Sequence, residues 1–229
     1  MIIITTQCFY PTIGGIEALM TGMAAAMYKS GKDLLVVADG KNDESDKIKT
    51  YNIKRFGGWK PIRRIKKARY ISQLCKTSNI EAIYADSWKS IEYLKNVNVP
   101  IFVLAHGTEI QKNINSLNFY KIFKQKRIFT SYKNSKQIIA NSNYTKELIK
   151  VSLNIDADKI CIVHPGIDIY EKFIQNHTIL KIKDIIKNSN PVLLTLARLE
   201  KRKGHKIVLQ VLSNLIDKFP NLLYIIAGD

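Results

Sequence analysis

A pair of glycines near the N-terminus stands where the backbone could approach an anion. Gly14 and Gly15 lie between an expected buried strand, residues 2–6, and an expected helix, residues 16–30. Glycines allow a ligand to come close to the backbone, and the N-terminus of a helix presents free N–H groups. The pattern indicates either a phosphate site or a plain turn. Glu17, in the first helical turn, complements the helix dipole.

A histidine and a carboxylate follow a second expected strand, residues 101–105. His106 comes directly after this strand, and Glu109 lies three residues further on. Open α/β sheets bind their ligands at the carboxyl ends of the strands. The two side chains could hold a polar substrate or transfer a proton. The alternative is a histidine whose ring is satisfied by backbone groups in a buried loop.

Four cations crowd residues 197–204, which follow an expected strand at 192–196. Arg198 and Lys203 flank this turn, next to the start of an expected helix at 205–219. Cations beside the N-terminus of a helix form a receptor for a diphosphate. A solvated loop is the alternative interpretation.

Several catalytic motifs are absent from the sequence. The sequence contains none of the patterns G-x-S-x-G, G-x-x-x-x-G-K-[ST], G-x-G-x-x-G and H-E-x-x-H. Their absence argues against a serine hydrolase, a P-loop nucleotidase, a simple Rossmann dehydrogenase and a zinc protease, in that order. Asp156 and Asp158 spell D-x-D, which we interpret as a solvated turn. Cys8, Cys75 and Cys161 are too few and too widely spaced for a disulfide framework or a zinc cluster. We predict no metal site.

The elements that position these residues alternate between strands and helices. Short apolar runs with helical segments between them are typical of a doubly wound parallel sheet. The composition, 46% hydrophobic and 24% charged, excludes a disordered or fibrous protein. We expect a complete Rossmann-like α/β domain at residues 1–166, a connector at 167–190 and the first βαβ unit of a second domain at 191–229. Expected helices include residues 62–76, 87–96, 118–133 and 205–219.

Five segments follow one another in an informative order. They are residues 9–17 with a Pro followed by Gly-Gly-x-Glu, residues 105–109 with an H-G-x-E element, and residues 138–142, 163–168 and 197–204. In order and spacing they resemble the motifs of GT-B glycosyltransferases of group 1, family 4. The resemblance covers the whole chain.

The resemblance implies a retaining transfer of a sugar from a nucleotide-sugar donor, bound in a cleft between two Rossmann-like domains. It implies catalytic roles for His106, Arg198 and Lys203. Donor binding would involve Gly14 and Gly15 together with the same two cations, and acceptor binding would involve Glu17 and Glu109. Preorganised cations can stabilise a departing diphosphate without a metal, so we expect no metal ion and no other cofactor.

Two departures from the family pattern affect this expectation. The family's E-x7-E element, which binds the donor's sugar and ribose, does not occur before the sequence stops at Asp229. Ala197 stands where many members have glycine. We therefore expect a chain truncated in its second domain, inactive alone and active when a longer reading frame or a partner chain supplies the rest. An open sheet edge should remain beside residues 192–196 or 222–227.

The positive charge of the chain is concentrated in one stretch. The net charge is +17, and residues 51–136 carry 18 Lys and Arg against four Asp and Glu. The expected helix 62–76 has an apolar stripe that packs either on its own sheet or on a membrane, and its cations, Lys67 among them, are expected on the other faces, in solvent. Residues 118–136 interleave aromatics with cations, and we interpret the aromatics as the buried side of a helix. Both segments could attract an anionic membrane surface.

These features lead to one preferred function and two alternatives. The preferred function is a glycosyltransferase of cell-surface polysaccharide synthesis, with a glycan or lipid-linked acceptor. Because the N-terminus lacks the pattern of a signal peptide, we expect a cytoplasmic protein, peripheral on the inner face of the cell membrane. The alternatives are a catalytically dead remnant that binds acceptor or membrane, and a basic nucleic-acid-binding protein. Nucleic acid is not the favoured partner.

Overall fold

A seven-stranded parallel sheet forms the centre of the first unit of the chain, Met1–Asp168, in the order β3-β2-β1-β4-β5-β6-β7. The computed structural model describes residues 1–95, 97–110, 119–166 and 176–228. Its strands are β1 (Ile2–Thr6), β2 (Leu34–Asp39), β3 (Asn52–Phe56), β4 (Ala82–Ala85), β5 (Ile101–Ala105), β6 (Gln137–Ala140) and β7 (Ile160–Ile162).

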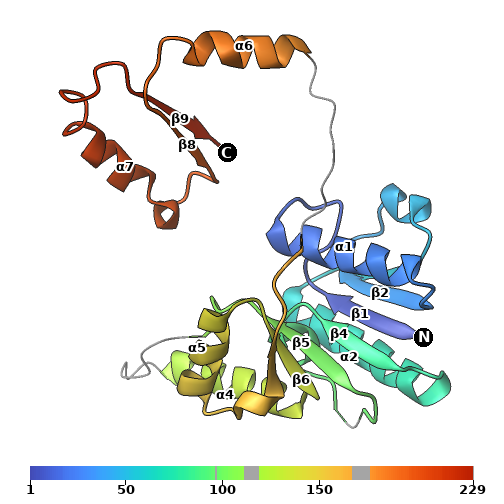
Figure 1. The fold of residues 1–229 in the computed structure, drawn as a ribbon. Helices are drawn as coiled ribbons and strands as arrows, with labels where there is room; N and C mark the ends of the chain where they lie inside the picture. The colour runs from blue at the N-terminus through green and yellow to red at the C-terminus, as the bar shows by residue number, and fades with distance from the viewer. Residues whose placement is uncertain (96, 111–118, 167–175, 229) are drawn as a thin grey trace. The chain divides into compact units, whose positions relative to one another are not determined.

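Helices connect these strands because parallel neighbours need crossover connections. They are α1 (Gly15–Lys29), α2 (Lys60–Thr77), α3 (Trp88–Ile91), α4 (Phe119–Asn134) and α5 (Asn143–Leu153), with 3₁₀ turns η1 (Glu44–Ile48) and η2 (Ala157–Lys159). Helix α1 lies on one side of the sheet and α2 on the other (Figure 1). Ser142 caps α5, as its side chain accepts from the backbone N–H of Thr145.

Each face of the sheet has its own apolar core. Successive residues of β1 alternate between them: Ile2 and Ile4 pack with Met20 of α1, and Ile3 packs with Ile71 of α2. All of these side chains are buried. A strand buried on both faces reads as a continuous apolar run, which is how β1 appears in the sequence. The expected doubly wound α/β fold is confirmed.

The strand order contains a switch point at β1. The chain first moves from β1 through β2 to β3, and it then returns to place β4 on the other side of β1. Thr5 of β1 lies in register with Ala85 of β4. The loops that follow these two strands therefore leave toward opposite faces of the sheet. Open α/β sheets bind ligands at the carboxyl ends of such a pair of strands.

The second unit, Ile169–Asp229, is described by itself. It contains α6 (Asn176–Ile186), β8 (Val192–Leu196), the 3₁₀ turn η3 (Lys201–Lys203), α7 (His205–Leu212) and β9 (Leu223–Ala227). Strands β8 and β9 pair in parallel and form a two-stranded sheet. Leu194 is 62% exposed and Leu196 is 79% exposed. Within the described residues of this unit, two strands do not enclose a core.

Two expected helices are shorter than the sequence indicates. The segment expected as helix 87–96 contains only α3, and Leu94 follows it in a turn that bonds back to Ile91. Asn96 lies outside the described residues. The segment expected at 205–219 is helical to Leu212 and continues as turns, since Ser and Asn at the next positions favour turns over helix interiors.

The aromatics of α4 also differ from expectation. Tyr132 is fully buried, but Phe119 is 88% exposed, Tyr120 72% and Phe123 61%. The interpretation that all of them form the buried side of the helix is wrong. Only the second half of α4 packs on the sheet, through Ile128 and Tyr132, and its first turns present aromatic rings to solvent. No helix within the described residues is both long and apolar enough to cross a membrane.

Candidate functional site

The first turn of α1 has space that the protein does not fill. Gly14 precedes the helix and makes no side-chain cap. A methyl group on Gly15 would meet no atom within 4 Å, whereas one on Gly14 would come within 2.2 Å of Glu17 Oε2. The Glu17 carboxylate therefore folds back over the start of the helix. The packing requires no glycine at Gly15, and the open space suits a ligand close to the backbone.

Asp86 joins the two loops at the switch point. Its Oδ2 accepts from the Thr6 hydroxyl at 3.1 Å and from the Gln7 N–H at 2.7 Å, so β4 holds the loop that follows β1. Its Oδ1 accepts from the hydroxyls of Ser87 and Ser90 at 3.1 and 2.6 Å. With four donors and 2% exposure, this carboxylate organises the edge of the sheet and does not face substrate.

His106 is held from one side and open on the other. Its Nε2 lies 2.8 Å from the backbone oxygen of Asp86. A carbonyl oxygen only accepts hydrogen bonds, so Nε2 carries the proton. In the described part of the chain, Nδ1 has no hydrogen-bond partner, and it can accept from a hydroxyl or, in the imidazolium, donate to a phosphate. The ring is thus satisfied by backbone at one nitrogen and available at the other.

Glu109 orders the loop that carries His106. Its Oε1 accepts from the His106 backbone N–H at 3.1 Å and from the Tyr132 hydroxyl at 2.7 Å. Burial, followed by the nearby Glu109 charge, raises the pKa of Tyr132 well above its ordinary value. Gly107 has φ +83°, and a methyl group there would lie 2.9 Å from the Thr145 hydroxyl. The loop conformation therefore requires a glycine at Gly107.

Cys8 lies close to both Glu17 of α1 and Asp86, which follows β4. Burial raises the pKa of its thiol to about 12, and the carboxylates of Asp86 and Glu17 contribute to the shift. The thiol stays protonated near pH 7, so it is not a nucleophile. Because Cys8 is next to both carboxylates, the α1 loop and the Asp86–His106 pair lie on one edge of the first unit. Gly14, Gly15, Glu17, His106 and Glu109 thus all belong to loops and helix starts at this one edge of the sheet.

Lys67 is a residue of this edge that the sequence interpretation misplaced. It is 2% exposed and donates to the Thr6 carbonyl at 2.7 Å and to Asp39 Oδ1 at 2.9 Å. Arg63 pairs with Asp39 Oδ2 at 2.8 Å. The expectation of a solvent-facing Lys67 is wrong, because its ammonium ties the ends of β1 and β2 together. Lys67 precedes Ile71 by four residues, which places both on the buried face of α2.

Arg55 holds the loop between β1 and α1, which we call the glycine loop. Its guanidinium makes two bonds of 2.6 Å to the Asp46 carboxylate and donates to the Tyr10 carbonyl at 2.5 Å. It is 9% exposed. The loop between β1 and α1 is therefore fixed by Asp86 at its start and by Arg55 further along.

The second unit holds the other two predicted site residues. Arg198 pairs with Glu200 at 3.2 Å and is 66% exposed in its side chain. Lys203 is exposed, belongs to η3, and has no ion pair in the described residues. His205 Nε2 lies 3.1 Å from the Arg198 carbonyl, so its N–H donates there and fixes the turn. Gly204, with φ +79°, then leads into α7.

A close approach of backbones fixes the strand end beside this turn. A methyl group on Gly228 would fall 1.9 Å from the Ala197 carbonyl oxygen, so Gly228 must lack a side chain. Within the described residues of the chain, no three His, Cys, Asp or Glu side chains gather closely enough to hold a metal ion. The predicted site residues thus offer a ligand two cations, the N-terminus of α1 and the Nδ1 of His106.

Comparisons with known proteins match the chain to glycosyltransferases. A sequence profile described as Glycosyltransferase Family 4 matches residues 13–171. A search of the curated proteins finds no match. Among solved structures, HepE of Anabaena in complex with UDP has a TM-score of 0.71 at 16% identity, covering 98% of this chain and 60% of its own. A glycosyltransferase from Rickettsia africae has a TM-score of 0.71 at 19% identity, covering 100% and 60%.

A third similar structure is WaaG, a glycosyltransferase involved in lipopolysaccharide biosynthesis. Its TM-score is 0.64 at 13% identity, and the match covers 99% of this chain and 63% of WaaG. The chain thus spans about 60% of the length of the structures it resembles. At these identities the likeness shows the fold, which is of GT-B type.

Proposed function

Because the chain belongs to Glycosyltransferase Family 4, we propose that it supplies the acceptor domain and part of the donor domain of a retaining glycosyltransferase. The donor would be a nucleotide sugar, since HepE has been solved with UDP and with UDP-glucose. One observation carries the proposal: the glycine loop, with unfilled space at Gly15, lies on the same sheet edge as the open Nδ1 of His106.

Each site residue has a role that its own surroundings support. Gly15 and the free N–H groups of α1 would receive a donor phosphate, which would replace the Glu17 carboxylate at the helix start. His106 Nδ1 would bind the donor sugar or its phosphate. Arg198 and Lys203 would stabilise charge on the departing diphosphate, a role that cations can fill without a metal ion. We therefore propose a reaction that needs no divalent cation.

The acceptor side is proposed from the same edge. Glu109 has one oxygen bonded to the His106 N–H and to Tyr132, and its Oε2, which has no partner among the described residues, would bind an acceptor hydroxyl. Glu17 would contact the acceptor after a donor phosphate displaces it from the start of α1. We propose a glycan or lipid-linked acceptor and a role in cell-surface polysaccharide synthesis, on the cytoplasmic side of the cell membrane.

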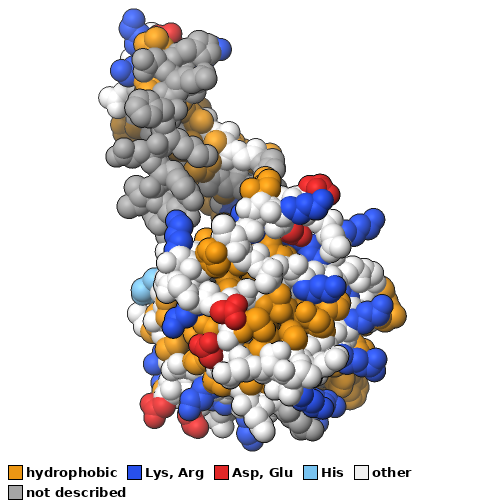
Figure 2. All heavy atoms as spheres, turned by 90° about the vertical axis from the view of Figure 1, so that its right-hand side faces the viewer, with side chains coloured by type: hydrophobic (Ala, Val, Ile, Leu, Met, Phe, Trp, Pro, Cys, Tyr) orange, Lys and Arg blue, Asp and Glu red, His pale blue; other side chains and the backbone are white. Residues whose placement is uncertain are grey.

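The charge and the exposed aromatics support attachment to an anionic membrane. Lys and Arg side chains spread over the face shown in Figure 2, around apolar groups. In α4 the exposed rings of Phe119 and Phe123 lie among cations of the segment 118–136. Sedimentation with anionic and neutral liposomes at low and high salt tests this attachment. Equal binding to both kinds of liposome would contradict attachment to an anionic membrane.

The exposed strand β8 supports the proposal that activity requires further strands in the second unit. Leu194 and Leu196 of β8 expose apolar side chains that a larger sheet and its helices would cover. We propose that the 229-residue chain transfers little or no sugar alone, and that it becomes active when joined to a complete second domain. We call that combination the reconstituted protein.

The test is donor consumption by both forms of the protein. Each is incubated with a panel of nucleotide sugars and a membrane extract as acceptor, and release of nucleoside diphosphate is measured. We expect release by the reconstituted protein, a large loss in its His106→Ala variant, and little from the chain alone. A reconstituted protein that binds acceptor but consumes no donor would identify the chain as a catalytically dead remnant. Salt-sensitive retention on RNA or DNA would instead support nucleic-acid binding.

A further inference from the structure

A cationic hollow lies beside α2, and none of the residues that line it belongs to the candidate transfer site. It has a volume of about 570 Å³, and its polar lining comes from Arg69, Ser72, Gln73, Lys76, Tyr93 and Lys95. Helix α2 starts at the carboxyl edge of the sheet, after β3, and runs back toward the amino ends of the strands. The polar lining residues of α2 belong to its second half, and Tyr93 and Lys95 belong to the segment that precedes β5. Arg69, Ser72 and Lys76 therefore follow the helix away from its start at the carboxyl edge.

The cations around this hollow differ from their neighbours on the same helix. Arg63 and Lys67, near the start of α2, pair with Asp39. Arg69, Lys76 and Lys95 make no ion pair within the described parts of the chain, and no Asp or Glu lines the hollow. Three unpaired positive charges around one concavity repel one another, and a bound anion relieves that repulsion.

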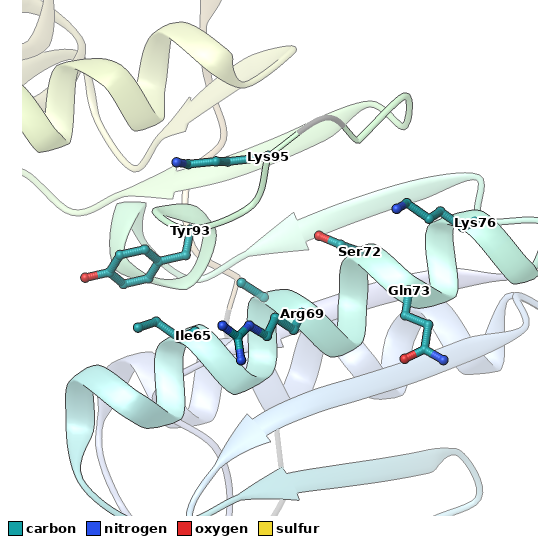
Figure 3. Close-up of a pocket in the computed structure, with 8 residues that line it drawn as sticks. Ile65, Arg69, Ser72, Gln73, Lys76, Tyr93 and Lys95 are labelled. Carbon is teal, nitrogen blue, oxygen red and sulfur yellow. The ribbon is translucent and has the colours of Figure 1, made fainter.

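The geometry brings the donors from two separate elements toward one space. Arg69, Ser72 and Lys76 are spaced by three and four residues, so they lie along one side of α2. Lys95 lies across the gap from them (Figure 3). A guanidinium, an ammonium and a hydroxyl are the groups that bind phosphate oxygens in proteins.

The rest of the lining is apolar. Ile65 lies at one end of the hollow, and the ring of Tyr93 lies next to it (Figure 3). Ala68, which is 4% exposed, completes this part of the wall. A ligand that fits would carry a phosphate group and an adjoining apolar or sugar portion. An aromatic ring offers a flat surface to either.

From these observations we propose that the hollow beside α2 is a second binding site, specific for the phosphate group of a phosphate ester. The ester is either the headgroup of an anionic phospholipid or a water-soluble sugar phosphate. The proposal does not depend on sugar transfer, since no residue that lines the hollow belongs to the candidate site, and the hollow can be tested on the 229-residue chain.

The test compares binding by the 229-residue chain and by the triple variant Arg69→Ala/Lys76→Ala/Lys95→Ala. Three probes are used: glucose 1-phosphate, a short-chain phosphatidic acid below its micelle concentration, and phosphatidylcholine vesicles with and without phosphatidic acid. We expect the triple variant to bind at least one phosphate probe at least about tenfold more weakly. All three side chains are exposed, so thermal unfolding should be nearly unchanged.

A matched variant separates a specific site from general charge. Lys29→Ala/Lys32→Ala/Lys41→Ala removes the same charge from exposed lysines that do not line the hollow. It should keep the binding of the unmodified chain. Equal weakening by the two triple variants, or no phosphate binding by the unmodified chain, would overturn the proposal. Binding of the soluble probes assigns the site to free phosphate esters, and binding that requires phosphatidic acid in a vesicle assigns it to a lipid headgroup.

Discussion

Replacing Gly15 with alanine tests whether this glycine is needed for the fold or for binding the donor. The added methyl group would meet no atom within 4 Å, so the substitution carries no packing cost. Alanine is favoured over glycine in helices by up to about 1 kcal/mol. The melting temperature should therefore stay the same or rise by about 2–4 °C. If a diphosphate binds at this backbone, the methyl group would disrupt charged hydrogen bonds, each with a net value of about 1.5–3 kcal/mol.

That loss corresponds to a decrease of about 10- to 150-fold in kcat/KM for the donor. The assay is nucleoside diphosphate release by the reconstituted protein at varied donor concentration, alongside thermal unfolding of the same samples. Gly22→Ala is the matched control, because Gly22 lies in the same helix and a methyl group there also meets nothing within 4 Å. Equal kinetics for the two variants would refute the assignment of the α1 loop to donor binding. A fall in melting temperature for Gly15→Ala would refute the statement that the space is open.

Three further predictions concern the second unit, the buried edge and high pH. In the reconstituted protein, Lys203→Ala should lower kcat/KM for the donor by about tenfold or more, while Lys201→Ala in the same exposed turn should change it little; equal effects would contradict a diphosphate role. Lys67→Met leaves a buried Asp39 without one of its partners, so the unfolding free energy measured with urea should fall by about 3 kcal/mol, and a change below about 1 kcal/mol would show that the pair contributes little. Because the pKa of Tyr132 is raised in the folded state, the unfolded chain loses its proton first as the pH rises above about 10, and stability should decrease there. Tyr132→Phe should have a shallower dependence of stability on pH in this range, and an unchanged slope would assign the effect to other groups.

The strands and the sheet type could be predicted from the sequence, because they follow from local apolar runs. Ile2–Thr6 and Ile101–Ala105 occur as expected, and Ser142 caps α5. The ends of α3 and α7 could not be predicted well, since they depend on where turns bond back to the chain. Burial within α4 depends on how far the helix packs on the sheet, and its exposed Phe119 and Phe123 were not predicted.

The candidate site was predictable where a residue directly follows a strand. His106 was selected in this way, with Glu109 three residues further on, and Asp86, which comes directly after β4, carried the same signal without being selected. Lys67 was missed because a cation in a basic helix suggests solvent. Its position four residues before Ile71, on the same side of the helix, was the feature of the sequence that indicated burial. Three-dimensional contacts alone show that Asp86 and Lys67 fix the loops that hold the predicted residues.

The most direct test of the central claim is the fate of a nucleotide sugar in the presence of EDTA. The reconstituted protein should convert donor to nucleoside diphosphate and glycosylated acceptor at the same rate with and without the chelator, and the new glycosidic bond should keep the donor's anomeric configuration. Failure to consume any nucleotide sugar from a broad panel, while the protein remains folded and binds acceptor, would contradict the account.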